Sequence, residues 1–214
     1  MNVNSKHIVI IGGVAGGASA AARARRHSED ARITIIERGP DVSFANCGLP
    51  YYVGDVIEEE EKLLLATPER FRDRFDIQVQ TETEVLRIDP EAREIEVREL
   101  RSGQTRREAY DALVLSPGAE PLRPALPGID LPGIFVLRTI PDSRRIRQAV
   151  GNATRAVVVG GGFIGLEMTE NLVRRGLEVT VVELADQLMP PLDREMASSV
   201  AVRLRENGVA LRLG

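Results

Sequence analysis

The sequence predicts an α/β protein built from two βαβ units, with a small antiparallel crossover sheet between them. An apolar run, a glycine-rich turn, a helix-forming segment and a second apolar run occur twice, over residues 7–37 and 155–183. The stretch between these copies alternates apolar and polar residues, as short strands do. With 214 residues, 43% of them hydrophobic, the chain is long enough to bury a core in one large domain or two small ones.

The first unit starts with an apolar run at 7–11, which predicts a buried parallel strand. A glycine-rich turn over 12–17 follows, and then an alanine- and arginine-rich helix over 18–27. The next apolar strand, 32–37, ends in the acid Glu37. This order is the Rossmann-like layout that binds a dinucleotide. The helix N-terminus offers unpaired N–H groups to the pyrophosphate, and the acid accepts hydrogen bonds from the ribose.

The first glycine turn departs from the strict G-x-G-x-x-G spacing. Counting from Gly12, the third position is Val14, whereas Gly17 fits the last position. Gly13 and Gly16 are expected to allow the close approach of the backbone to the ligand instead. A flexible glycine loop is the alternative, and the flanking strand, helix and acid favour the nucleotide interpretation.

The second unit fits the pattern in full. A strand over 155–159 leads into 160–165, which satisfies G-x-G-x-x-G, and a helix is expected over 166–175. The following strand, 178–183, ends in Glu183, which lies 23 positions after the first glycine. An acid there favours the free 2′-hydroxyl of NAD over the 2′-phosphate of NADP. Two such units in one chain indicate two dinucleotides, a flavin and a nicotinamide.

The segment between the units predicts a helix over 58–74, interrupted near Pro68, whose glutamates begin a solvated helix. Alternating residues predict three strands of an antiparallel sheet, at 77–86, 94–100 and 105–110.

A buried strand over 110–115 is then expected to return beneath the first unit, ending in a tight turn. The proline- and glycine-rich stretch 121–132 is the best linker candidate, and the arginines of 134–150 are expected to form a solvated helix face. The predicted domains are 1–120 for the first nucleotide, 121–150 as linker and return segment, and 151–214 as an incomplete second nucleotide domain.

Bulk properties exclude several classes of function. The single cysteine rules out a disulfide framework and fits a reducing cytoplasm. No apolar run approaches the roughly 20 residues of a membrane span. A net charge of −4 does not favour nucleic acid as a partner, and two histidines with one cysteine give no metal-ligand cluster.

Cys47 is the only cysteine in the chain. A free cysteine is usually a small buried hydrophobe. Its neighbours Asn46, Gly48 and Pro50 are turn residues, however, which favours an accessible thiol at the start of a helix over 49–57. Because the chain has no second cysteine, any disulfide partner of this thiol must come from a substrate.

Taken together, these motifs resemble the flavin- and pyridine-nucleotide-dependent disulfide oxidoreductase family over essentially the whole chain. Tyr52 stands five residues after Cys47, where members with a Cys-x4-Cys motif carry the second cysteine, so the resemblance implies the single-cysteine branch. Within it, Ser-Phe-Ala-Asn-Cys-Gly-Leu-Pro-Tyr is most similar to the coenzyme A disulfide and persulfide reductases. Four blocks carry the resemblance: 12–17 with Glu37, the segment around Cys47, 115–118, and 160–165 with Glu183.

The resemblance implies FAD on the first unit, NADH rather than NADPH on the second, and a redox-active Cys47 beside the flavin. The turn at 116–118 is similar to the family's Ala-Thr-Gly flavin contact, with serine and proline in the first two places. The implied cofactor-binding residues are Gly12, Val14, Ala15, Gly16, Gly17, Glu37, Arg38, Ser43, Asn46, Val85, Ser116, Pro117, Gly118, Gly160, Gly162, Phe163, Ile164, Gly165, Glu167 and Glu183.

Coenzyme A disulfide or persulfide is the implied substrate, and the implied contacts are Ser19, Arg23, Arg26, Ser43 and Asn46. Arg23 departs from the uncharged residue expected there, and a solvated helix face explains both arginines equally well. The resemblance also implies a homodimer for the full-length protein and no metal.

Two alternatives stay open at this point. One is an NADH oxidase or peroxidase that cycles Cys47 through a sulfenate, and the other is a nucleotide-binding redox module without catalysis. Family members continue with a Gly-Asp motif that contacts the flavin and with a dimer domain, so the chain is expected to be part of a longer protein.

Overall fold

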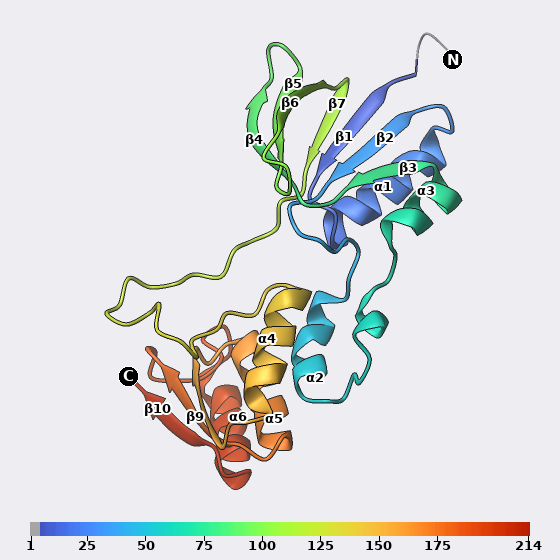
Figure 1. Ribbon diagram of the computed structural model, residues 1–214. Helices are drawn as coiled ribbons and strands as arrows, with labels where there is room; N and C mark the ends of the chain where they lie inside the picture. The colour runs from blue at the N-terminus through green and yellow to red at the C-terminus, as the bar shows by residue number, and fades with distance from the viewer. Residues whose placement is uncertain (1–4) are drawn as a thin grey trace. The chain divides into compact units, whose positions relative to one another are not determined.

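The computed structural model describes residues 5–214, and the chain divides into two compact units (Figure 1). The first unit holds the residues up to Ala45 together with Leu64–Glu120. The second holds Asn46–Leu63 together with Pro121–Gly214. Each unit contains a parallel sheet covered by helices, which confirms the predicted α/β class.

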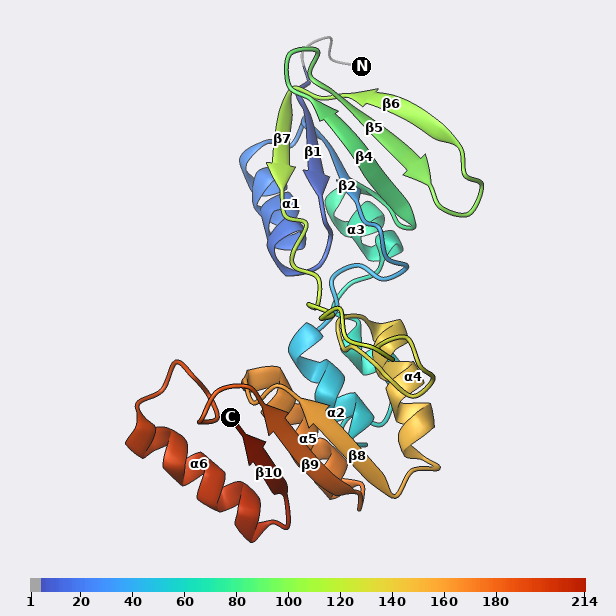
Figure 2. The same ribbon diagram turned by 90° about the vertical axis from the view of Figure 1, so that its left-hand side faces the viewer.

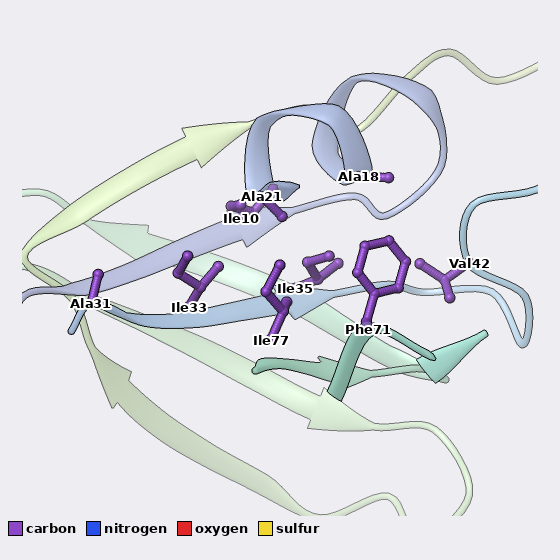
Figure 3. Packing of buried hydrophobic residues seen from close by; sticks show 9 residues of the cluster. All are labelled: Ile10, Ala18, Ala21, Ala31, Ile33, Ile35, Val42, Phe71 and Ile77. Atoms are coloured by element: carbon purple, nitrogen blue, oxygen red, sulfur yellow. The ribbon is translucent and has the colours of Figure 1, made fainter. Parts of the chain in front are cut away.

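The first unit is built on a four-stranded parallel sheet in the order β3-β2-β1-β7. Helices α1 and α3 cover one face, where the side chains of a hydrophobic cluster pack between helix and sheet (Figure 3). Ile10, Ile35 and Ile77 of this cluster are fully buried. The element bounds are β1 His7–Ile11, α1 Ala15–His27, β2 Arg32–Ile36, α3 Pro68–Phe75, β3 Ile77–Gln80 and β7 Ala112–Leu115.

A three-stranded antiparallel sheet covers the other face of the parallel sheet. Its order is β4-β5-β6, with β4 Thr83–Asp89, β5 Glu94–Glu99 and β6 Thr105–Ala109. Val9 and Ile36 of the parallel sheet share a buried cluster with Ile95 and Val97 of β5. The first unit therefore has three layers, with the parallel sheet in the middle.

Three expectations for the segment between the nucleotide motifs were wrong. The strand predicted over 77–86 is two strands in different sheets, because the chain turns at Glu82, where φ is 50°. The strand predicted as buried over 110–115 is shorter and lies at the sheet edge, which leaves Leu115 61% exposed. In place of a helix over 58–74, there are a 3-10 turn at Glu60–Leu63 and α3, which begins at Pro68.

The second unit is built on the parallel sheet β10-β9-β8, with helices packed on one face (Figure 2). Ala156 and Val158 of β8 point into the core, whereas Val157 and Val159 are exposed on the opposite face, as the period of a strand requires. The bounds are α4 Ile140–Val150, β8 Arg155–Val159, α5 Phe163–Arg174, β9 Glu178–Glu183, α6 Arg194–Glu206 and β10 Ala210–Leu213.

The segment Asn46–Leu63 belongs to the second unit although it precedes the antiparallel sheet of the first in sequence. It contains a 3-10 turn, η1 (Asn46–Gly48), then α2 (Leu49–Val53), and a second 3-10 turn, η2 (Glu60–Leu63). Helix α2 contacts both α4 and α5. The predicted helix over 49–57 is therefore present but ends four residues early, at a C-cap on Gly54.

The two βαβ units agree closely with the strands predicted from the apolar runs. Both helices begin three residues earlier than expected, at Ala15 and Phe163, because the last residues of each glycine turn already form the first helical turn. The stretch 121–132 contains neither helix nor strand. Among residues 5–214, none of the helices is long and apolar enough to cross a membrane.

Candidate functional site

The first glycine turn is closed by backbone contacts that leave no room for a side chain at either end. Gly12 has a φ of 94°, and its N–H donates to the carbonyl of Ile36 at 2.8 Å. A Cβ at Gly12 would overlap the carbonyl of Ser116, and a Cβ at Gly17 would overlap the carbonyl of Gly12. The turn therefore requires glycine at both ends, and it lies directly against the 116–118 turn that follows β7.

Glu37 is held in place at the end of β2 by two backbone donors. Its Oε2 accepts a hydrogen bond from the N–H of Gly13 and its Oε1 accepts one from Gly39, both at 2.7 Å. Each carboxylate oxygen retains a further lone-pair direction. The acid is thus oriented in advance and still has acceptor capacity for the hydroxyls of a ribose.

The second glycine turn repeats the first. Gly160 has a φ of 106°, and its N–H donates to the carbonyl of Val182 at 2.8 Å. A Cβ at Gly165 would overlap the carbonyl of Gly160, whereas a Cβ at Gly160 or Gly162 would meet nothing within 4 Å. The open space beside these two glycines leaves the backbone accessible to a ligand.

Glu183 occupies the same position relative to the second turn as Glu37 does to the first. Its Oε1 accepts a hydrogen bond from Ala185 at 2.8 Å and its Oε2 accepts one from Gly161 at 2.6 Å. The backbone N–H of Ala185, and then that of Gly161, lowers the pKa of Glu183 from its usual value of 4.5. The side chain is therefore a firmly ionised acceptor at neutral pH, which suits a free ribose hydroxyl and repels a phosphate.

The helices that follow both turns present uncapped N-termini. Neither Val14 at the start of α1 nor Gly162 at the start of α5 makes a side-chain capping bond, and neither helix has an acid in its first turn. The first N–H groups of a helix and the positive end of its dipole favour a bound phosphate. Phe163 and Ile164, 66% and 59% exposed, add an apolar surface at the start of α5. Both turns thus fit a dinucleotide.

Cys47 lies exposed in the 3-10 turn that precedes α2. Its backbone N–H donates to the Oδ1 of Asn46 at 3.1 Å. Cys47 is thus not the small buried hydrophobe that a free cysteine usually is. Both Cys47 and the glycine turn at 160–165 belong to the second unit.

The predicted substrate residues fall into two groups. Ser19, Arg23 and Arg26 are exposed and share one face of α1, because they are spaced four and three residues apart. The Nε of Arg26 contacts the carbonyl of Ala22 at 3.3 Å. Ser43 lies in the first unit with a φ of 49°, whereas Asn46 lies beside Cys47 in the second.

The remaining predicted cofactor residues lie around the two turns or on the sheets. A Cβ at Gly16 would overlap the Oγ of Ser116, which places that serine against the start of α1. Gly118 has a φ of 73°, as a tight turn requires. Val85 packs into the cluster between the two sheets of the first unit, and Arg38 pairs with Glu84 at 3.3 Å. Ala15 is exposed in the first turn of α1, and Glu167 is half-buried on α5.

Sequence reasoning missed the backbone donors at Gly39 and Ala185. Each lies two residues after the acid that it orients, and the two copies share this spacing. The sequences after the two acids, Arg38-Gly39 and Leu184-Ala185, have no residue in common, so no sequence signal marked these donors. No group of metal ligands occurs among the residues that the structure describes.

The fold and the two turns define a protein with two dinucleotide-type binding sites and an accessible single cysteine. The chain belongs to the pyridine nucleotide-disulphide oxidoreductase family, which it matches over residues 6–214. The family resemblance drawn from the sequence is thereby confirmed.

Known relatives agree with this assignment. The coenzyme A disulfide reductase of Staphylococcus epidermidis is 39% identical over 207 residues, which are 96% of this chain and 47% of the relative. The crystal structure of reduced Bacillus anthracis CoADR-RHD superposes with a TM-score of 0.95 at 49% identity, over 98% of this chain and 38% of that one. The structure of an NAD-dependent persulfide reductase from A. fulgidus superposes with a TM-score of 0.93 at 39% identity, over 97% of this chain and 39% of that one. The chain thus spans about half the length of the curated relatives it matches.

Proposed function

We propose that the protein acts in a flavin-dependent NAD(P)H:disulfide oxidoreductase that reduces coenzyme A disulfide or persulfide at Cys47. The observation that carries the proposal is the exposed position of the only cysteine, in a chain with two preformed dinucleotide turns. The similarity to proteins named coenzyme A disulfide reductase and persulfide reductase supports this choice of substrate.

Two dinucleotides would divide between the two units. FAD would lie on the turn at 12–17 with Glu37 on its ribose, and NADH on the turn at 160–165 with Glu183 on its ribose. When bound, the flavin supplies the passage of two electrons from a nicotinamide to sulfur. The ionised Glu183 favours NADH over NADPH, because the 2′-phosphate would face a carboxylate that two backbone N–H groups hold in place.

The chemistry proper to this chain is thiol–disulfide exchange. The Cys47 thiolate attacks one sulfur of the substrate, a bond forms between the two sulfurs, and the other half leaves as a thiolate that takes a proton from water. The mixed disulfide then needs two electrons and one proton, which NADH supplies, to release the second thiol and restore Cys47. Because the chain contains no second cysteine, no internal thiol resolves the mixed disulfide.

The exposed stripe of Ser19, Arg23 and Arg26 is proposed to meet the phosphates of coenzyme A, since guanidinium groups suit phosphate oxygens. Ser43 and Asn46 would contact the same substrate closer to its sulfur. A cytoplasmic location, favoured by the single cysteine, and a homodimer are part of the same proposal.

The test is the absorbance spectrum of purified protein, recorded before and after NADH and then after coenzyme A disulfide. The proposal requires a flavin spectrum that bleaches with NADH and returns with the disulfide. Cys47→Ser should still bleach with NADH and should lose disulfide turnover. Alkylation of the wild-type protein with iodoacetamide, which reports on this one cysteine, should reproduce the effect of the substitution.

Other outcomes separate the alternatives. Faster reoxidation by oxygen or peroxide than by coenzyme A disulfide indicates an oxidase or peroxidase. A protein that binds nucleotide but shows no NADH-dependent bleaching indicates a module without catalysis. Unchanged disulfide turnover in Cys47→Ser would remove the cysteine from the mechanism.

A further inference from the structure

The segment that carries Cys47 is held in the second unit by the C-terminal end of α2, which packs against α4 and α5 (Figure 2). Val53, the last residue of α2, is fully buried in a cluster with residues of α4 and α5. At the next residue, Gly54, a Cβ would overlap the side chain of Asn171 on α5. The Nη1 of Arg175 donates to the carbonyl of Val53 at 3.2 Å. Backbone and side chains at the end of α2 thus fit closely against α5.

Asp55 joins this segment to two helices at once. Its Oδ1 lies 2.5 Å from the Nη2 of Arg147 on α4, and its Oδ2 pairs with the Nη1 of Arg175 at the end of α5. The side chains of these arginines are only 25% and 21% exposed, so water screens the two ion pairs incompletely. Asp55 has a φ of 58°, a left-handed conformation that aspartate and asparagine adopt more readily than most residues.

Further contacts of the same arginine surround this bridge. The guanidinium of Arg147 lies 4.3 Å from the ring centroid of Tyr52 and donates to the carbonyl of Glu58 at 2.9 Å. Glu60 accepts two hydrogen bonds from Arg144, at 2.5 and 2.9 Å, and these lower its pKa. Each polar contact connects the residues that follow Cys47 to α4 or to the end of α5.

We propose that Asp55 is a positioning residue for Cys47. Helix α2 has only five residues and is too short to be stable by itself. The orientation of the turn at its N-terminus therefore depends on the contacts that hold the helix, and those at its C-terminus are among them. By binding Arg147 and Arg175 together, Asp55 fixes that end against α5, the helix whose N-terminus follows the glycine turn at 160–165. This inference rests on the proposed function, in which the Cys47 thiol carries out the exchange with the disulfide.

The test substitution is Asp55→Asn, which keeps the size of the side chain and tolerates the left-handed backbone but removes the charge. Asp55→Gly is the second variant, because it removes the carboxylate and relieves the backbone as well. The matched control is Asp186→Asn, which breaks the pair of Asp186 with Arg194 in the same unit, at the start of α6. All three are compared with the wild-type chain in its flavin-loaded form.

In both Asp55 variants, the backbone amides of residues 49–57 other than Pro50 should exchange with solvent about tenfold faster, which corresponds to about 1.4 kcal/mol of local stability. Their kcat with coenzyme A disulfide should fall about tenfold, while the KM for NADH and the rate of flavin bleaching by NADH stay unchanged. A general loss of structure would also change the KM for NADH and the rate of flavin bleaching, so an effect on kcat alone indicates a positioning role. The Asp186→Asn control should match the wild type in each measurement.

Wild-type exchange rates or a wild-type kcat in both Asp55 variants would overturn the positioning role. A wild-type protein that reduces no disulfide would instead overturn the proposed function. In that case the exchange rates and the rate of alkylation of Cys47 by iodoacetamide, neither of which needs turnover, decide on Asp55. A wild-type rate of alkylation and exchange in both variants would refute its role there too.

Discussion

Substitution of two glycines in the second turn should distinguish an effect on nucleotide binding from an effect on stability. Gly162 caps α5 with a φ of −84° and a ψ of −173°, which alanine adopts without strain, and its Cβ would meet nothing within 4 Å. Alanine is a poorer N-cap than glycine, so Gly162→Ala should lower the free energy of unfolding by less than about 1 kcal/mol. Under the proposed function, however, the new methyl group would occupy the space through which the pyrophosphate would approach the backbone.

Gly165→Ala should have the opposite signature. Its Cβ would overlap the backbone carbonyl of Gly160 and lie 3.4 Å from Cγ1 of Val158, so the helix must shift away from the turn. Overpacking of this kind costs about 1–3 kcal/mol. For a chain of this size, that loss corresponds to a melting temperature lower by about 2–12 °C.

The assay combines thermal melting with titration of NADH followed by its fluorescence. We expect Gly162→Ala to melt close to the wild type and to bind NADH at least about tenfold more weakly, a loss of about 1.4 kcal/mol. Gly151→Ala is the control, since Gly151 ends α4 with an ordinary φ of −57°. Wild-type affinity for NADH in Gly162→Ala would refute the assignment of the nucleotide to this turn.

Three further predictions follow from the packing and the charges. Ile35→Ala removes a fully buried side chain and should cost about 2–5 kcal/mol in chemical denaturation, whereas Leu65→Ala, at a side chain 59% exposed, should cost far less; equal losses would contradict the core assignment. Thr139→Ala removes the capping box of α4 and should cost about 1 kcal/mol, and an unchanged denaturation midpoint would contradict it. Because its folded pKa is depressed, ionised Glu183 stabilises the fold above its unfolded pKa, and this is lost as the pH falls through the folded pKa; the stability gap between wild type and Glu183→Gln should therefore be full at pH 7 and shrink below about pH 4.5. A gap that stays constant to pH 3 would contradict this.

The sequence was sufficient wherever one local pattern determines the structure. The apolar runs at 7–11 and 155–159 became strands with the predicted bounds, because a short apolar run that ends at a glycine turn is recognisable from the local sequence alone. The stretch 77–86 was predicted wrongly because its local pattern does not show where one strand ends and the next begins. Its alternation of polar and apolar residues is equally compatible with one strand or two, and only the turn at Glu82 divides it between sheets.

The part of the site that escaped prediction depends on pairs far apart in sequence. The arginines of α4 were expected to face solvent and Glu60 to begin a solvated helix. In the structure, Arg147 binds Asp55 and Arg144 binds Glu60. Charged residues on an amphipathic helix look alike whether they meet water or an acid more than 80 positions away, so no local pattern distinguishes the two cases.

The carboxylate of Glu183 binds the backbone of its own turn as well as the proposed ribose, and this limits any redesign of cofactor preference. The oxygens that would recognise a ribose also accept hydrogen bonds from the N–H groups of Gly161 and Ala185. A basic replacement, chosen to admit a phosphate, would leave those two donors without an acceptor and loosen the turn around them. An engineered switch to NADPH has to supply a new acceptor for the main chain along with a cation for the phosphate.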